Sequence, residues 1–388
     1  MIYLLRMVRR TFWIDRIQKL WKRRSIIWLS GVRRIGKTFL CKSLSNILYF
    51  DCELPRTRRL FDDPEDFLAN HKNKTLIIDE IHRLDNPSEL LKIAADYYPK
   101  TKIIATGSST LGASSKFKDT LAGRKTELWL TPAILQDMAD FEKTDIKKRL
   151  LKGGMPQALL TKAKWEKEYS EWMDAFWAKD IQELFRLERR HSFLKFIELL
   201  FVNSGSMFEA TKYSTPCEIS RTTIHNYLSV LESTFVFHVI RPFNTHRANE
   251  IISAPKVYGF DTGFVCFYKG WDALRLDDLG YLWEHFVLNE LHANIQTRQI
   301  LYWRDKRDHE IDYILRSKTK GTIAIECKWS SHSFSWKNLE SFRQQYPKGL
   351  NYVVSQDIDE PYSRTVNKNT AHFVNPNDLI TQLKKSKI

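Results

Sequence analysis

The first third of the chain alternates short apolar runs with segments of helical periodicity. The apolar runs lie at residues 26–29, 47–50, 76–78, 103–105 and 128–130. Continuous apolar strands that alternate with helices are typical of a parallel sheet covered by helices on both faces. The pattern therefore predicts an α/β domain, which ends near Thr131 and Pro132.

The rest of the chain predicts a helical middle and a mixed C-terminal part. Helical periodicity continues to about residue 190 with a break at residues 153–156. Within residues 193–243 we expect further helices and then a strand at residues 235–240. From about residue 280 the pattern predicts helix, strand, strand, helix and strand, with a hairpin turn at residues 318–321. We expect this last part to fold as an α+β domain.

Composition and charge add a prediction about partners. The chain has 388 residues, of which 43% are hydrophobic, so we expect about two to four globular domains. The formal net charge of +15 and the pI of about 9.4 favour a polyanionic partner such as DNA. A Lys-rich proteome would give the same charge, so DNA binding needs support from a specific site.

Cysteine usage and hydropathy predict a cytoplasmic protein. None of the cysteines forms a C-x-x-C pair or a zinc-spaced cluster with histidines, and scattered cysteines suit a reducing compartment. The apolar start followed by arginines is not the order of a signal peptide. No run of about eighteen apolar residues occurs, so we expect no membrane span.

A phosphate-binding loop follows the first predicted strand. Residues 31–38 satisfy the pattern G-x-x-x-x-G-K-[ST] in full and open a predicted helix. Glycines let the backbone wrap closely around phosphates, to which the N–H groups present partial positive charge. We expect Lys37 to neutralise the β- and γ-phosphates of ATP, and the Thr38 hydroxyl to bind Mg²⁺. The expected nucleotide-binding residues of this loop are Gly31, Arg34, Gly36, Lys37 and Thr38.

Two acids end the predicted strand at residues 76–78. Asp79 is expected to hold Mg²⁺ through water, and Glu80 to polarise the attacking water as general base. An acidic pair after a strand is otherwise a solvated strand end. Its place downstream of a complete phosphate loop favours the catalytic interpretation.

Polar residues also follow the next apolar strand, at residues 103–105. Ligands of parallel sheets bind at the carboxyl ends of the strands, so Thr106 or Ser108 is a candidate sensor of the γ-phosphate. The alternative role of these residues is a helix N-cap or a turn.

Several short stretches together resemble a known family. They are GVRRIGKT, LIIDEIHRL, IIATGSS, LAGR, GGMPQAL, PKVYGFDTGF, EIDYIL and AIECKWS. The chain resembles, over nearly its whole length, bacterial and archaeal AAA+-like P-loop ATPases that carry a C-terminal domain of unknown function. The resemblance implies that Arg124 of LAGR acts as an arginine finger for a neighbouring subunit in a homo-oligomer. Arg83 is a rival finger, and the alternative for Arg124 is a surface arginine that bonds a helix end.

A helix that begins near Ser220 resembles the recognition helix of a winged-helix domain. Its apolar positions predict one buried face, formed by Ile224, Tyr227, Leu228 and Leu231. The residues left outward near its N-terminal end are Arg221, Thr222, His225 and Asn226. A recognition helix contacts DNA with such residues. Winged helices also serve as protein-interaction modules or lid extensions, so both roles stay open.

Charged residues on the two strands of the predicted hairpin form a second constellation. Strand alternation places Glu326 and Lys328 on one face, and Asp312 on the adjoining strand can join them. Two close carboxylates can bind Mg²⁺ or Mn²⁺, and a lysine can orient the water that attacks a phosphodiester.

The spacing D-x₁₃-E-x-K of these residues resembles the PD-(D/E)XK nuclease core. Such folds often add an acid from a preceding helix, where Glu284 matches and Glu290 is the alternate. The alternative is a set of ordinary charges on exposed strands.

Four segments follow from these patterns. They are a P-loop AAA+-like ATPase domain at 1–135, a helical lid at 136–190, a winged-helix-like domain at 191–250 and a PD-(D/E)XK nuclease-like domain at 251–388. The leading hypothesis is an ATP-regulated, Mg²⁺-dependent enzyme that acts on DNA. The alternatives are an ATP-switched DNA- or protein-binding module with an inactive nuclease-like domain, and a signalling ATPase with a protein partner.

Overall fold

The computed structural model describes residues 8–107, 121, 123–160, 166–185, 187–244, 254–317 and 319–386. The chain divides into two compact units. The N-terminal unit comprises Met1–Thr144, Met155–Arg190 and Ser229–Val236, and the C-terminal unit comprises Asp145–Gly154, His191–Leu228 and Phe237–Ile388. Within the described residues, no helix is both long enough and apolar enough to span a bilayer.

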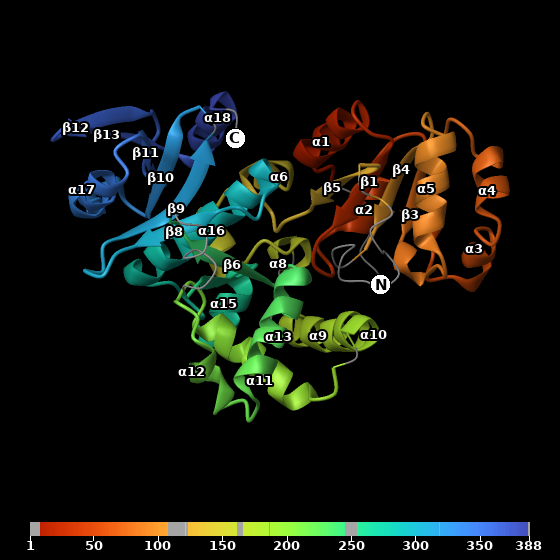
Figure 1. The fold of residues 1–388 in the computed structure, drawn as a ribbon, viewed down its shortest axis with the longest axis horizontal. Helices are drawn as coiled ribbons and strands as arrows, with labels where there is room; N and C mark the ends of the chain where they lie inside the picture. Colours follow the sequence, from red (N-terminus) through yellow and green to blue (C-terminus); the bar gives the residue numbers. More distant parts are fainter. Residues whose placement is uncertain are drawn as a thin grey trace. The chain divides into compact units, whose positions relative to one another are not determined.

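The N-terminal unit is built on a five-stranded parallel sheet of order β2-β3-β4-β1-β5 (Figure 1). The strands are β1 (Ile26–Ser30), β2 (Ile47–Asp51), β3 (Thr75–Asp79), β4 (Lys102–Thr106) and β5 (Lys125–Trp129). The parallel α/β sheet predicted from the apolar runs is confirmed. β1 lies between β4 and β5 and is buried along its whole length, as a central strand of continuous apolar residues requires.

The helices of this unit occur between and after the strands. They are α1 (Thr11–Trp21), α2 (Lys37–Lys42), α3 (Pro55–Arg59), α4 (Pro64–Asn70), α5 (Pro87–Tyr97), α6 (Leu135–Asp140), α8 (Pro156–Leu160), α9 (Glu166–Ala175) and α10 (Gln182–Phe185), with a π-helical turn at Phe176–Ile181. Leu90, Leu91 and Ala94 of α5 join Ile78 and Ile103 of the sheet in one apolar core. These residues recur at helical spacing, which explains why this segment forms a helix against the sheet.

A buried ion pair braces this unit. Arg10, just before α1, forms an ion pair with Asp137 of α6 at 2.6 Å, and both side chains are almost inaccessible to solvent. The same guanidinium donates to the carbonyls of Ile35 and Thr131 at 3.1 and 3.3 Å. One arginine therefore holds the phosphate loop, the segment after β5 and α6 together.

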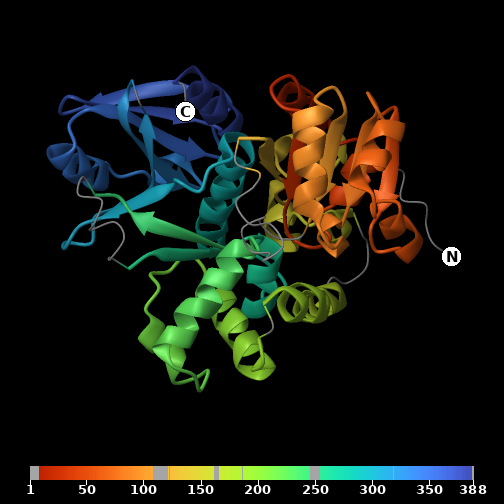
Figure 2. The same ribbon diagram turned by 45° about the vertical axis from the view of Figure 1, so that its right-hand side comes forward.

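The C-terminal unit is built on an eight-stranded mixed sheet of order β12-β13-β11-β10-β9-β8-β6-β7 (Figure 2). The strands are β6 (Phe237–Pro242), β7 (Lys256–Gly259), β8 (Leu301–Arg304), β9 (Glu310–Ser317), β10 (Gly321–Lys328), β11 (Gly349–Ser355), β12 (Tyr362–Val366) and β13 (Asn369–Val374). β9 and β10 form the predicted antiparallel hairpin, in which Ser317 pairs with Gly321. β11 runs parallel to β10 because α17 (Trp336–Gln345) connects them.

The remaining helices of this unit are α7 (Ile146–Lys152), α11 (Arg190–Val202), α12 (Ala210–Ser214), the first residues of α13 (Arg221–Ser233), α15 (Thr262–Lys269), α16 (Leu276–Ile295) and α18 (Pro376–Lys385). The predicted break after α7 is confirmed at Gly153, which has a φ of 74°. A Cβ at Gly153 would lie 1.9 Å from the carboxylate of Asp261, which accepts a hydrogen bond from the Gly154 N–H at 2.5 Å. Only glycine fits this position.

The predicted helix near Ser220 is confirmed as α13. Ser220 caps it, since its hydroxyl accepts a hydrogen bond from the Thr223 N–H at 3.1 Å. The predicted apolar face is buried, while Arg221, His225 and Asn226 are exposed. The winged-helix assignment itself remains a prediction.

Removal of the carboxylate from the buried pair tests its contribution to stability. Asp137→Ala should lower the free energy of unfolding by about 3–5 kcal/mol, because it leaves the Arg10 guanidinium buried without a counter-charge. The control is Asp140→Ala on the same helix, which removes a partly solvated acceptor of the Thr11 N–H and should cost about 1 kcal/mol. Urea denaturation measures both, and equal losses would contradict a special role for the pair.

Candidate functional site

The phosphate loop joins β1 to α2 through two glycines with positive φ. Gly31 has a φ of 143°, and a Cβ there would lie 2.5 Å from the carbonyl oxygen of Leu130. Gly36 is left-handed, with a φ of 99°, and caps α2. The loop can therefore pass close to β5 and turn into the helix only with glycine at these positions.

Lys37 is buried and folded back onto its own loop. Its Nζ donates to the carbonyl oxygens of Gly31 and Val32 at 2.8 and 3.1 Å. Burial lowers the pKa of Lys37, while the nearby carboxylates of Glu80, Asp180 and Asp79 oppose that shift. Phosphate oxygens placed in the loop would compete with these two carbonyls for the ammonium group.

The Asp79 carboxylate accepts hydrogen bonds from side chains on or next to several strands. It accepts hydrogen bonds from the Thr38 hydroxyl at 2.7 Å, from the Tyr49 hydroxyl at 2.5 Å, and from the Thr106 hydroxyl. The Thr106 Oγ1 also accepts the Glu80 N–H at 3.0 Å. Thr106 is fully buried, so its contacts fit a residue that positions the two acids. The other candidate sensor, Ser108, lies outside the described residues.

Glu80 occupies a strained position after β3. Its φ of 52° is left-handed, which is uncommon for a residue with a Cβ and recurs at functional sites. Burial raises the pKa of the Glu80 carboxyl, and the cation of Lys37 opposes this shift. A carboxylate with a raised pKa beside a phosphate-binding loop has the character of a general base.

A cavity of about 360 Å³ brings these groups together. It is lined by the sequence-predicted residues Arg34, Gly36, Lys37, Thr38, Asp79 and Glu80, and also by Tyr49 and Arg33. Tyr49 was missed by the motif analysis, although a hydroxyl within the apolar run at residues 47–50 is a signal that could have found it.

The segment after the sheet also contacts the phosphate loop. Arg33 forms an ion pair with Asp180 at 2.7 Å, and the Trp172 indole donates to the Arg33 carbonyl at 2.8 Å. Asp180 lies in the π-helical turn Phe176–Ile181, and such turns recur at functional sites. No sequence motif pointed to Trp172 or Asp180, since each looks like an ordinary helix residue.

Arg124 is held within its own chain. Its guanidinium pairs with Asp96 of α5 through two contacts of 2.7 and 3.1 Å, and both side chains are about one-third exposed. It is not among the described residues that line the cavity. A role as arginine finger would require Arg124 to leave Asp96 and reach a second copy.

The C-terminal acids Asp312 and Glu326 lie on the same side of the β9–β10 hairpin. Lys328 Nζ lies 2.8 Å from Glu326 and 3.9 Å from Asp312. The pairing of β9 with β10 extends to Tyr313 and Ile325. Beyond that pair, the Cys327 N–H donates a hydrogen bond to the Asp312 carboxylate at 2.7 Å. The backbone pairing of β9 and β10 therefore ends where Asp312 and Glu326 lie.

Glu326 keeps one oxygen without a partner. Its Oε1 is buried and forms no hydrogen bond with any described residue, while burial raises the pKa of the carboxyl to about 7. Burial likewise raises the pKa of Asp312. A buried pair of carboxylate oxygens with spare acceptor capacity suits a hard divalent cation.

Glu284 of α16 has other partners. It accepts from the Tyr258 hydroxyl and lies 3.5 Å from Lys256, which also pairs with Glu310. Across the described parts of the chain, no group of three or more His, Cys, Asp or Glu side chains is arranged to hold a metal ion. The hairpin thus assembles Asp312, Glu326 and Lys328, and the charge of Glu284 is close enough to contribute to the raised pKa of Asp312. Lys256, in an otherwise apolar strand, was not singled out from the sequence.

Comparison with known families defines the class of the first unit. Residues 23–139 match the model of a family described as an AAA domain. With the phosphate loop and the parallel sheet, this match defines a P-loop ATPase domain that binds ATP. Residues 143–275 and 279–371 match two further families, each described only as a domain of unknown function (DUF8612 and DUF4143).

Two similar proteins come from bacteria. An uncharacterized protein of Mycobacterium tuberculosis is 24% identical over 309 residues, which is 76% of this chain and 69% of that protein. One of Haemophilus influenzae is 23% identical over 61% of this chain and 67% of its own length.

Two solved structures are similar to part of this chain. A Walker-type ATPase of Pyrococcus abyssi has a TM-score of 0.43 at 14% identity, covering 66% of this chain and 94% of its own. AMPPCP-bound DnaA of Aquifex aeolicus has a TM-score of 0.32 at 9% identity, covering 59% and 92%.

The contacts of Thr106 predict a kinetic effect without a binding effect. Thr106→Val removes the hydroxyl that bonds Asp79 and the Glu80 N–H, so ATP hydrolysis should slow by roughly 10- to 100-fold while ATP affinity changes little. The matched control is Thr101→Val at the other end of β4, where a buried hydroxyl accepts the Asn73 N–H at 3.0 Å. Similar ATPase losses in both variants would reduce Thr106 to a stability residue.

Proposed function

We propose that the N-terminal unit hydrolyses ATP in a Mg²⁺-dependent reaction. The observation that carries this proposal is the cavity in which Lys37, Thr38, Asp79 and Glu80 converge. Lys37 would leave the loop carbonyls to neutralise the β- and γ-phosphates, and Glu80 would take the proton of the attacking water.

The oxygens of Thr38 and Asp79, which lie 2.7 Å apart, fit a Mg²⁺ site. When bound, Mg²⁺ would neutralise charge on the phosphates. Arg124 would complete the site of a neighbouring copy in a homo-oligomer, once released from Asp96.

We further propose that ATP turnover regulates an action on DNA by the C-terminal unit. The buried, unpartnered oxygen of Glu326 beside Asp312 supports metal-dependent cleavage, with Lys328 positioned to orient water. Glu284 would be an additional metal ligand only if it left Lys256. The exposed N-terminal end of α13, with Arg221 and His225, supports DNA contact. The competing function is binding of DNA or protein without cleavage.

Two substitutions separate ATP binding from hydrolysis. Glu80→Gln should keep ATP affinity and slow hydrolysis by roughly 100-fold or more, because it removes the base but keeps the phosphate loop. Lys37→Ala should lose both, since the loop loses its buried cation. Phosphate release and binding of a fluorescent ATP analogue measure the two effects, and Lys72→Ala, an exposed lysine outside the cavity, is the control. Wild-type turnover in Glu80→Gln would rule out its role as base.

The acidic pair predicts a separate loss of DNA cleavage. Asp312→Asn and Glu326→Gln should end cleavage supported by Mg²⁺ or Mn²⁺ and leave ATP hydrolysis unchanged, because the ATP site has its own acids. Asp308→Asn, an exposed acid just before β9, is the control. Gel assays should use single-stranded, duplex and branched DNA with and without ATP. Absence of cleavage by the wild-type chain on all of them would favour the binding-module alternative.

A further inference from the structure

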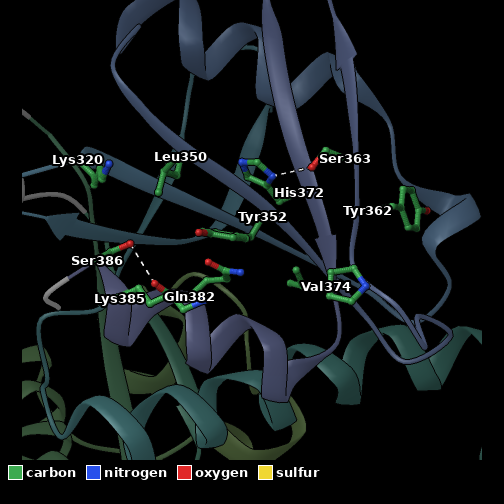
Figure 3. Close-up of a pocket in the computed structure, with 11 residues that line it drawn as sticks. Lys320, Leu350, Tyr352, Tyr362, Ser363, His372, Val374, Gln382, Lys385 and Ser386 are labelled. Atoms are coloured by element: carbon green, nitrogen blue, oxygen red, sulfur yellow. Dashed lines mark hydrogen bonds between the residues drawn. The ribbon is translucent and has the colours of Figure 1, made fainter.

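A second cavity, of about 450 Å³, lies in the C-terminal unit between α18 and the β11–β13–β12 part of the sheet. Figure 3 shows Tyr352 in the middle of its lining, with His372 on one side and Gln382 on the other. Tyr352 pairs with Ile325 across the strands, whereas Glu326 pairs with Val353. Adjacent strand residues face opposite sides of a sheet, so this cavity is on the other face from the Glu326 carboxylate.

The cavity contains polar groups that the fold does not use. Tyr352 is only 4% exposed, and its hydroxyl forms no hydrogen bond with any described residue. The side-chain amide of Gln382 likewise forms none within the described chain. Both groups line the cavity and therefore have hydrogen-bonding capacity that a ligand could use.

The charge of the lining is one-sided. Lys320 and Lys385 are exposed lysines on the rim, and neither forms an ion pair with a described residue. No acidic side chain is among the described residues of the lining. The cavity therefore favours an anion.

The remaining walls favour a planar group. The rings of Tyr352 and His372 lie on neighbouring strands with centroids 5.5 Å apart and planes inclined by 40°. His372 shares a hydrogen bond of 2.8 Å with the Ser363 hydroxyl through Nδ1, which leaves Nε2 for a ligand. Burial lowers the pKa of His372, which favours the neutral form of the ring.

We propose that this cavity binds a single nucleotide, with its base against His372 and the hydroxyl end of Tyr352 and its phosphate between Lys320 and Lys385. A volume of about 450 Å³ is in the range of small-molecule sites. The shared chemistry is a phosphate ester with an aromatic base, supplied either by a free nucleotide or by one unit of a nucleic-acid strand. Base stacking on aromatic rings and lysine contact to phosphate are general features of such recognition. The site does not depend on the proposed cleavage by Asp312 and Glu326.

Calorimetry on the full chain tests the proposal. The Lys37→Ala background removes binding at the ATP site, and the titrants are uridine 5′-monophosphate, uridine, inorganic phosphate and a thymidine hexanucleotide. The monophosphate or the hexanucleotide should bind at least 10-fold more tightly than uridine or phosphate. Preference for the monophosphate identifies a free nucleotide as ligand, and preference for the hexanucleotide identifies a strand.

Variants locate the binding in the cavity. Lys320→Gln/Lys385→Gln should weaken binding by 10-fold or more, and Tyr352→Phe by roughly 3- to 10-fold through loss of one hydroxyl contact. Lys368→Gln/Lys384→Gln carries the same charge change on exposed lysines outside the lining and should bind as the parent does. The proposal is overturned by equal binding of inorganic phosphate, by absence of binding at millimolar nucleotide, or by unchanged affinity in both cavity variants.

Discussion

The ATPase unit depends on the need to satisfy one buried carboxylate. Asp79 is only 4% exposed, and an unpaired buried charge would cost far more than the fold could tolerate. Its donors come from three other strands or their loops: Thr38 after β1, Tyr49 on β2 and Thr106 at the end of β4. The hydrogen bonds that stabilise Asp79 therefore also fix the relative positions of the phosphate loop and the catalytic acids.

In the C-terminal unit the buried carboxylates have fewer of the partners that they need. Lys328 lies close enough to Glu326 and Asp312 to offset their charge, and the Cys327 N–H donates a hydrogen bond to Asp312. One oxygen of Glu326 still has no partner in the described structure, and burial raises the pKa of this carboxyl to about 7. A site built for a cation would carry this kind of deficit, whereas a purely structural pair would gain stability by removing it.

The sequence predicted the parts of the molecule whose chemistry is local. The phosphate loop needs glycines at Gly31 and Gly36 for backbone reasons, so its pattern is visible in eight consecutive residues. The hairpin of β9 and β10 was visible for the same reason, since alternation and a turn specify it. The edge strand β12, exposed at every position, was missed because it lacks a run of apolar residues. β8 was missed although residues 300–303 form a short apolar run.

Residues that act through tertiary contacts could not be found this way. Asp180 reaches Arg33 across 147 positions, and Lys256 meets Glu284 and Glu310 from a different strand. Nothing local distinguishes these side chains from surface charges. Thr106 was singled out as a candidate sensor, and only the structure could show that it is fully buried and bonded to Asp79.

The contacts of the phosphate loop imply that nucleotide binding is also a conformational event. Lys37 is bonded to Gly31 and Val32, so phosphates must replace two existing hydrogen bonds before they gain its charge. Arg33, within the same loop, is held through its side chain by Asp180 and through its carbonyl by Trp172. Any rearrangement of the loop must change these contacts or move the helical segment that makes them. If ATP binding rearranges the loop, part of its binding energy would be used to move that segment, which is the physical requirement for a nucleotide to control structure beyond its own site.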